Sequence, residues 1–118
     1  MLLKDKVVIV SGIGPGLGIE LALLAAQEGG KLAICARTAS KLDAAERDVA
    51  ALGLGTEVLK VPTDIADREQ CRKLVERTVE RFGRVDALIN SAYVGGGFGP
   101  IETADLDDWR ATMDINFF

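Results

Sequence analysis

The residues best placed to do chemistry are the glycines in the stretch SGIGPGLG, which begins at Ser11 and ends at Gly18. Glycines between a strand and a helix allow a tight turn and let a phosphate approach the helix N-terminus, where free N–H groups favour negative charge. The spacing is G-x-x-x-G-x-G with an extra glycine, Gly14, and no Lys-Ser or Lys-Thr pair follows it. The stretch therefore predicts a dinucleotide pyrophosphate site rather than a triphosphate loop. The alternative is a tight turn that binds nothing.

The end of the second predicted strand indicates which dinucleotide the site prefers. NAD-binding folds carry an acid there, which accepts hydrogen bonds from the adenosine ribose. This chain has Ala36 followed by Arg37 instead. A carboxylate would repel a 2′-phosphate, whereas a guanidinium can pair with it through two hydrogen bonds. We therefore expect NADP as the preferred cofactor, with NAD as the second choice. The alternative is that Arg37 is an ordinary solvated residue at a strand end.

Alternating apolar and amphipathic segments supply the scaffold for these residues. Short apolar runs closed by glycine or proline are typical of buried strands, and longer segments with a 3.6-residue apolar period are typical of helices. Strands are predicted at 7–11, 32–36, 57–61 and 85–90, and helices at 17–28, 40–52, 67–82 and from about 104 onward. Because the two alternate with short connections, we predict an α/β fold: a Rossmann-type, doubly wound parallel sheet of about four strands with helices on both faces.

The apolar patterns also predict how these elements pack. The strands are apolar on both sides, as a sheet covered on both faces requires. In the first helix, the residues predicted to face inward are Leu17, Leu21, Leu24 and Ala25. In the third helix they are Cys71, Leu74, Val75, Thr78, Val79 and Phe82. The last helical pattern reaches Phe118 without a stop signal, so we expect residues 1–118 to be one dinucleotide-binding domain that is incomplete at its C-terminal end.

The composition excludes several classes of function. The net charge is −4, with acids and bases interspersed, which argues against nucleic acid or an anionic membrane as a partner. Histidine is absent, which removes His-based triads and His-ligated zinc, and Cys35 and Cys71 lack the spacing of a metal site. No apolar run reaches membrane-spanning length, and we find no signal peptide. We therefore expect a cytoplasmic protein without a metal.

Four short motifs resemble those of the short-chain dehydrogenase/reductase family. The glycine stretch matches the family pattern T-G-x-x-x-G-x-G, with Ser11 in place of threonine. Thr63-Asp64-Ile65 matches the aspartate that follows the family's third strand. Asn90-Ser91-Ala92-Tyr93 corresponds to N-N-A-G, and Asp114-Ile115-Asn116 corresponds to D-x-N. The motifs occur in the family's order and span essentially the whole chain, so the chain is similar to the N-terminal half of a family member.

The resemblance implies a role for each matching position. Gly12, Gly16 and Gly18 would admit the pyrophosphate, and Asp64 would accept a hydrogen bond from the adenine amino group. Asn116 would be the active-site asparagine, which holds a kinked helix and a water of the proton relay. The other cofactor-binding positions that the motifs imply are Ser11, Gly14, Leu17, Ile65, Asn90, Ala92 and Tyr93. Pro15 stands where many NADP-preferring members carry a basic residue, so Arg37 alone supports that preference.

By resemblance, the family's catalytic serine and its Tyr-x-x-x-Lys lie beyond the position of Asn116. No Tyr-x-x-x-Lys occurs in these residues, because the single tyrosine, Tyr93, has Gly97 four positions later. By resemblance, the parent protein is a homo-oligomer that transfers hydride between a nicotinamide and a small alcohol or carbonyl substrate. The chain alone is expected to be inactive. The alternatives are a non-catalytic NADP(H)-binding module, a methyltransferase, which would want an acid after the second strand, and a nucleotide-sugar epimerase, which usually has the spacing G-x-x-G-x-x-G.

Overall fold

The computed structural model describes residues 1–14, 16–92 and 105–116, with only the backbone at 108, 112, 115 and 116. The strands are β1 (Val7–Ser11), β2 (Lys31–Ala36), β3 (Val58–Pro62) and β4 (Ala87–Asn90). The helices are α1 (Leu17–Gln27), α2 (Ala39–Ala50), α3 (Arg68–Phe82) and α4 (Leu106–Asn116). The predicted order of elements is confirmed, and the described bounds differ from the predicted ones by at most two residues.

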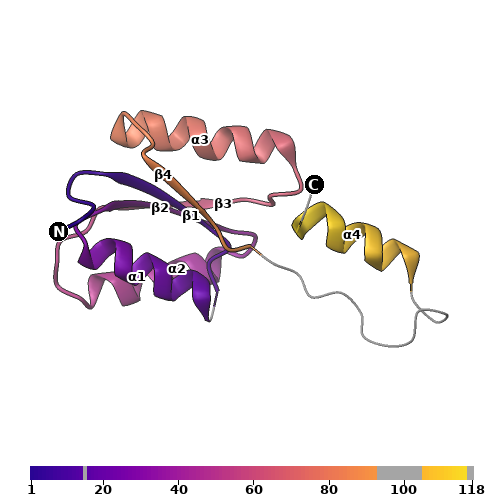
Figure 1. Ribbon diagram of the computed structural model, residues 1–118, viewed down its shortest axis with the longest axis horizontal. Coiled ribbons are helices and arrows are strands. Elements are labelled where there is room, and N and C mark those ends of the chain that lie inside the picture. Colours follow the sequence, from indigo (N-terminus) through magenta and orange to yellow (C-terminus); the bar gives the residue numbers. More distant parts are fainter. Residues whose placement is uncertain (15, 93–104, 117–118) are drawn as a thin grey trace.

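The four strands form one parallel sheet in the order β3-β2-β1-β4. Helices α1 and α2 cover one face of this sheet, and α3 covers the other (Figure 1). The predicted Rossmann-type, doubly wound sheet is therefore confirmed. The chain steps outward from β1 to β3 and then returns to the opposite side of β1 to form β4. In open α/β sheets, ligands bind outside the carboxyl ends of the strands at such a switch point.

Helix α3 has clear start and stop signals in the sequence. The Asp67 carboxylate accepts hydrogen bonds from the N–H groups of Glu69 (3.0 Å) and Gln70 (3.2 Å), so it caps the first turn. Gly83 closes the helix with a φ of 81° and donates its N–H to the Val79 carbonyl at 2.7 Å. These local signals explain why the predicted bounds of this helix agree with the structure.

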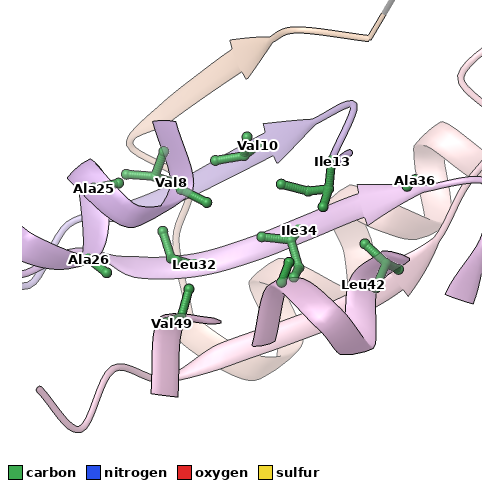
Figure 2. Packing of buried hydrophobic residues seen from close by; sticks show 12 residues of the cluster. Val8, Val10, Ile13, Ala25, Ala26, Leu32, Ile34, Ala36, Leu42 and Val49 are labelled. Carbon is green, nitrogen blue, oxygen red and sulfur yellow. The ribbon is translucent and has the colours of Figure 1, made fainter. Parts of the chain in front are cut away.

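The main hydrophobic core lies between the sheet and the two helices α1 and α2 (Figure 2). Alternate residues of β1 and β2 point into it, because successive side chains in a strand point to opposite faces. Its central residues are Val8, Val10, Leu32, Ile34, Ala25, Ala26, Leu42 and Val49. The opposite face of the same strands packs with β3 and α3 in a smaller cluster: Ile9, Ala33, Cys35, Val61 and Leu74. Strands β1 and β2 are thus buried on both faces, as predicted.

The predicted inward face of α1 was wrong in part. Leu17 is 67 % exposed and Leu24 is 55 % exposed, whereas Leu21 is half-buried and Ala25 is buried. The buried positions of this helix are all small: Gly18, Ala22, Ala25 and Ala26. Small residues let the helix approach the sheet and the glycine turn closely, and this turns the large leucines away from the core.

The predicted packing of α3 and β4 was also wrong in part. Leu74 and Thr78 are buried, but Val75 and Val79 are nearly half exposed, and Leu88 on β4 is 56 % exposed. Helix α3 packs over β2 and β3 rather than over β4. Within the described part of the chain, nothing covers β4 on this face. The fourth strand therefore does not share the two-sided burial of β1 and β2.

Candidate functional site

A cavity of about 490 Å³ lies at the carboxyl ends of the strands, at the switch point between β1 and β4. The segments that follow all four strands contribute to its wall, as do the first turns of α1 and α2. Eight predicted cofactor-binding residues line it: Gly12, Gly14, Leu17, Gly18, Arg37, Asp64, Ile65 and Ala92. Three others, Ser11, Gly16 and Asn90, do not line it. Tyr93 lies outside the described residues, and Asn116 ends α4 with a side chain that is also outside them.

Two glycines of the turn after β1 are required by close backbone contacts. A Cβ on Gly12 would overlap the backbone of Ala92 and lie 2.6 Å from the Ser91 carbonyl carbon. A Cβ on Gly18 would overlap the Gly12 carbonyl oxygen. A Cβ on Gly14, in contrast, would have no neighbouring atom within 4 Å. The turn is therefore compact where it meets β4 and α1, and it is open at Gly14.

The glycine turn is held in place by hydrogen bonds to β2 and by a side chain that packs in the core. The N–H groups of Gly12 and Ile13 both donate to the Cys35 carbonyl, at 3.0 and 3.1 Å. The Ile13 side chain is only 4 % exposed and lies beside Val10 and Ile34 (Figure 2). These contacts fix the backbone of the turn before any ligand binds.

The N-terminus of α1 meets the cavity through Leu17 and Gly18. The residue before the helix, Gly16, has no side chain that could cap the first turn. The N–H groups of the first turn have no partner within the helix, and the dipole places partial positive charge there. This part of the wall suits an anionic group, and Leu17 adds an exposed apolar side chain beside it.

Asp64 and Thr63 stand at the end of β3, on the far side of the cavity. The Thr63 N–H donates to the Ala36 carbonyl at 2.8 Å, which ties the ends of β3 and β2 together. One Asp64 carboxylate oxygen, Oδ1, accepts from the Ala66 N–H at 3.0 Å, and the Asp64 N–H donates to Gln70 Oε1 at 2.8 Å. This turn orients the carboxylate and leaves its second oxygen able to accept another hydrogen bond.

Arg37 follows the end of β2 and is exposed in the cavity wall. Within the part of the chain that the structure describes, its guanidinium has no ion pair and no hydrogen bond. Thr38, next to it, is the N-cap of α2, but its side chain makes no capping hydrogen bond. The wall after β2 therefore presents a guanidinium and a hydroxyl, and no carboxylate.

Ser91 connects the end of β4 to the glycine turn. Its N–H and its hydroxyl both donate to the Ser11 carbonyl, at 2.9 and 2.7 Å. The hydroxyl also lies 3.5 Å from the Gly12 carbonyl. These bonds hold β4 against β1 at the point where Ala92 meets Gly12. Ser91 thus positions one wall of the cavity relative to the other.

The Ser11 side chain at the end of β1 is 3 % exposed and does not line the cavity. Its hydroxyl has no hydrogen-bond partner among the described residues. Its register partner on β2, Cys35, is fully buried, and this burial raises the pKa of the Cys35 thiol. The thiol therefore stays neutral and acts as a packing residue, because the thiolate is the nucleophile.

Several residues of the cavity wall were not predicted as site residues from the sequence. They are Ile13, Cys35, Ala36, Thr38, Lys41, Thr63 and Ser91. Thr63 and Ser91 stand within quoted motifs, so their positions carried a signal. Lys41 carried none, because a lysine in the first turn of an amphipathic helix is typical of a solvated surface.

The described residues contain no group of three or more His, Cys, Asp or Glu side chains that could hold a metal ion. None of their helices has both the length and the apolar character that a membrane crossing requires.

Comparison with known proteins places this geometry in a large group of enzymes. A family model described as short chain dehydrogenase matches residues 6–118. An uncharacterized oxidoreductase of Listeria monocytogenes is 36 % identical over 116 residues, which are 98 % of this chain and 46 % of the relative. The 11-beta-hydroxysteroid dehydrogenase A of Sesamum indicum is 40 % identical over 115 residues, 96 % of this chain and 32 % of the relative. The chain spans less than half the length of these relatives.

Solved structures with the same arrangement include complexes with both nicotinamide dinucleotides. The crystal structure of levodione reductase matches with a TM-score of 0.93 and 33 % identity, covering 97 % of this chain and 44 % of that one. A metagenomic short-chain oxidoreductase in complex with NADP matches with a TM-score of 0.89 and 28 % identity over 98 % of this chain and 52 % of that one. NAD⁺-bound xylitol dehydrogenase matches with a TM-score of 0.91 and 30 % identity, covering 98 % of this chain and 44 % of that one.

Proposed function

The chain belongs to the short-chain dehydrogenase family, and from this premise we propose that its cavity is the nicotinamide-dinucleotide site of an oxidoreductase. The observation that carries the proposal is the glycine turn at the switch point. Side chains are excluded at Gly12 and Gly18 by backbone contacts, and the turn leads into a helix whose first N–H groups have no partner within the helix. A diphosphate needs this combination of close backbone approach and positive dipole.

The rest of the wall fits the remaining parts of such a cofactor. The free oxygen of Asp64 can accept a hydrogen bond from an adenine amino group. Ile65 and Ala92 offer small or apolar surfaces for the flat parts of the molecule. When bound, the cofactor supplies the hydride chemistry, and the protein orients it. The described residues of the cavity wall thus bind and position the cofactor.

For the whole protein, we propose hydride transfer between the nicotinamide and a small alcohol or carbonyl substrate. The names of two structural relatives, levodione reductase and xylitol dehydrogenase, are consistent with that class. This chain contains no Tyr-x-x-x-Lys, so it lacks the proton-transferring pair that the family resemblance implies. We expect the chain alone to bind the cofactor without turning over substrate. A turnover rate comparable to that of a full-length relative would contradict this expectation.

Arg37 supports NADP as the preferred cofactor. The guanidinium has no partner among the described residues and stands at the end of β2, where an acid would favour NAD. A 2′-phosphate can pair with it through two charge-assisted hydrogen bonds. NAD is the second choice, because most of the wall consists of backbone and apolar groups that do not distinguish the two cofactors.

Fluorescence titration of the chain with NADPH and NADH tests the proposal. We expect Arg37→Asp to weaken NADPH binding by about tenfold or more and NADH binding by much less, because it replaces attraction for a phosphate with repulsion. Arg77→Asp is the matched control, since it makes the same charge change on an exposed residue of α3 outside the cavity. Equal losses of affinity for both cofactors would contradict the NADP preference. If the unchanged chain bound neither cofactor, the assignment of the cavity as a dinucleotide site would be refuted.

A further inference from the structure

Lys41 stands where two cavities meet. It is the third residue of α2 and lies in the wall of the main cavity together with Arg37 and Thr38. It also lines a second cavity of about 210 Å³, which shares the residues Ile13 and Gly14 with the first. The lysine therefore reaches the space between the start of α2 and the open part of the glycine turn.

The acidic residues of α2 near Lys41 are largely engaged elsewhere. Asp43 and Glu46 both pair with Lys60 on β3, at 2.9 and 3.1 Å. Lys41 and Arg37 have no ion pair within the described residues. The side of the main cavity that follows β2 therefore presents two unpaired cations and no acid.

The backbone of α2 adds to this positive field. The side chain of the N-cap residue Thr38 makes no capping hydrogen bond, so its hydroxyl and the first N–H groups of the helix remain able to bind an anion. The helix has 12 residues, enough for its dipole to favour negative charge at this end. One carboxylate, Asp48, lines the smaller cavity, but it does not line the main one.

Building on the proposed NADP preference, we propose that Lys41 is a second charged contact for the 2′-phosphate and that it determines cofactor choice together with Arg37. A phosphate monoester carries a charge of about −1.5 to −2 near neutral pH, so one guanidinium leaves part of it uncompensated. Lys41 supplies a second positive charge from the first turn of α2, and its three donors suit a phosphate oxygen that the bidentate guanidinium does not reach. The Thr38 hydroxyl, between the two cations in sequence, is a third group that can donate a hydrogen bond to the phosphate.

Calorimetric titration with two matched probes isolates the contact. Adenosine 2′,5′-bisphosphate and 5′-AMP differ only in the 2′-phosphate. We expect Lys41→Met in the full chain to weaken the bisphosphate by about three- to tenfold and 5′-AMP by less than about twofold, since an exposed charge pair is partly screened. Lys41→Arg should retain most of the bisphosphate affinity. Lys73→Met removes the same charge from α3, outside both cavities, and should leave both affinities unchanged.

The outcomes separate this inference from the function on which it rests. Equal losses for the two probes in Lys41→Met, or no loss for either, would overturn the role of Lys41. If Arg37→Asp still selectively weakens the bisphosphate, the NADP preference survives without Lys41. If the unchanged chain binds both probes equally, or neither, the NADP preference and the role of Lys41 fall together. A selective loss in Lys73→Met would show that net charge, rather than this contact, is the cause.

Discussion

Replacing Gly18 by alanine should destabilise the fold, although alanine is the better helix former. Gly18 is the second residue of α1, and its position is set by the turn that precedes the helix. A Cβ there would overlap the Gly12 carbonyl oxygen and lie 3.1 Å from the Gly12 carbonyl carbon and 3.3 Å from Ile13 Cα. All three atoms belong to backbone that hydrogen bonds tie to the Cys35 carbonyl. No rotamer change relieves this clash, so the turn or the helix must move.

The magnitude follows from two opposing effects. Alanine gains up to about 1 kcal/mol over glycine in a helix interior, and less in the first turn. Overpacking a dense site costs typically about 1–3 kcal/mol, and more where backbone must shift. We therefore expect a net loss of about 1–2 kcal/mol in the free energy of unfolding, which lowers Tm by roughly 5–10 °C in a domain of this size. Affinity for a dinucleotide should fall as well, since the displaced turn forms the wall of the cavity.

Gly14→Ala is the matched control in the same turn. A Cβ at this position meets nothing within 4 Å, and its φ lies outside the left-handed region. This substitution should change stability by less than about 1 kcal/mol, in the stabilising direction, because it restricts the unfolded chain. Thermal unfolding followed by circular dichroism measures both variants. If Gly18→Ala were as stable as the unchanged chain, or if both variants lost equal stability, the close contact between α1 and the turn would be refuted.

Three further predictions concern other contacts. Ser91→Ala removes the hydroxyl that donates to the carbonyl at the end of β1, and we expect the free energy of unfolding to fall by about 1 kcal/mol in urea titrations. The Val7 N–H donates a hydrogen bond to the Asp86 carboxylate and lowers its pKa. The unchanged chain should therefore be more stable than Asp86→Asn above about pH 5, and this difference in the free energy of unfolding should disappear progressively as the pH falls below about 4. A difference that stayed constant with pH would contradict this. Burial raises the pKa of both the Cys35 and the Cys71 thiols, but Cys35 is fully buried and Cys71 only half-buried, so iodoacetamide should modify Cys71 first, as judged by mass spectrometry of peptides.

The sequence allowed the fold and much of the cavity wall to be predicted, because the relevant signals are local. Apolar runs closed by glycine mark the strands, and parallel strands bring their carboxyl ends to one edge of the sheet. This is why Gly12, Arg37 and Asp64, far apart along the chain, line one cavity. The motif singled out Gly12, Gly16 and Gly18, and backbone contacts exclude a Cβ at Gly12 and Gly18. At Gly16 a Cβ would meet no neighbouring atom within 4 Å, and the φ of 106° is what favours glycine there.

The packing faces were harder to predict, because they depend on distances between elements. Large apolar residues at helical spacing suggested that Leu17 and Leu24 face the sheet. The close approach of α1 to the glycine turn instead buries small residues such as Ala22. Similarly, the apolar pattern of β4 did not reveal that α3 covers its neighbours and leaves Leu88 exposed. The apolar period of a helix identifies its buried face only when the distance between the helix and the sheet is known.

Under the proposed function, the wall of the cavity divides into two parts with separate effects on cofactor binding. The glycine turn and the N-terminus of α1 present backbone groups to parts that NADPH and NADH share, and the hydrogen bonds from Ser91 hold that turn in place. Arg37 and Lys41 act through side-chain charge and meet only the phosphate that distinguishes the two cofactors. Changes in the first part should therefore lower both affinities by a similar factor. Changes in the second should alter their ratio, which makes that ratio the measurement that separates positioning residues from residues that select the cofactor.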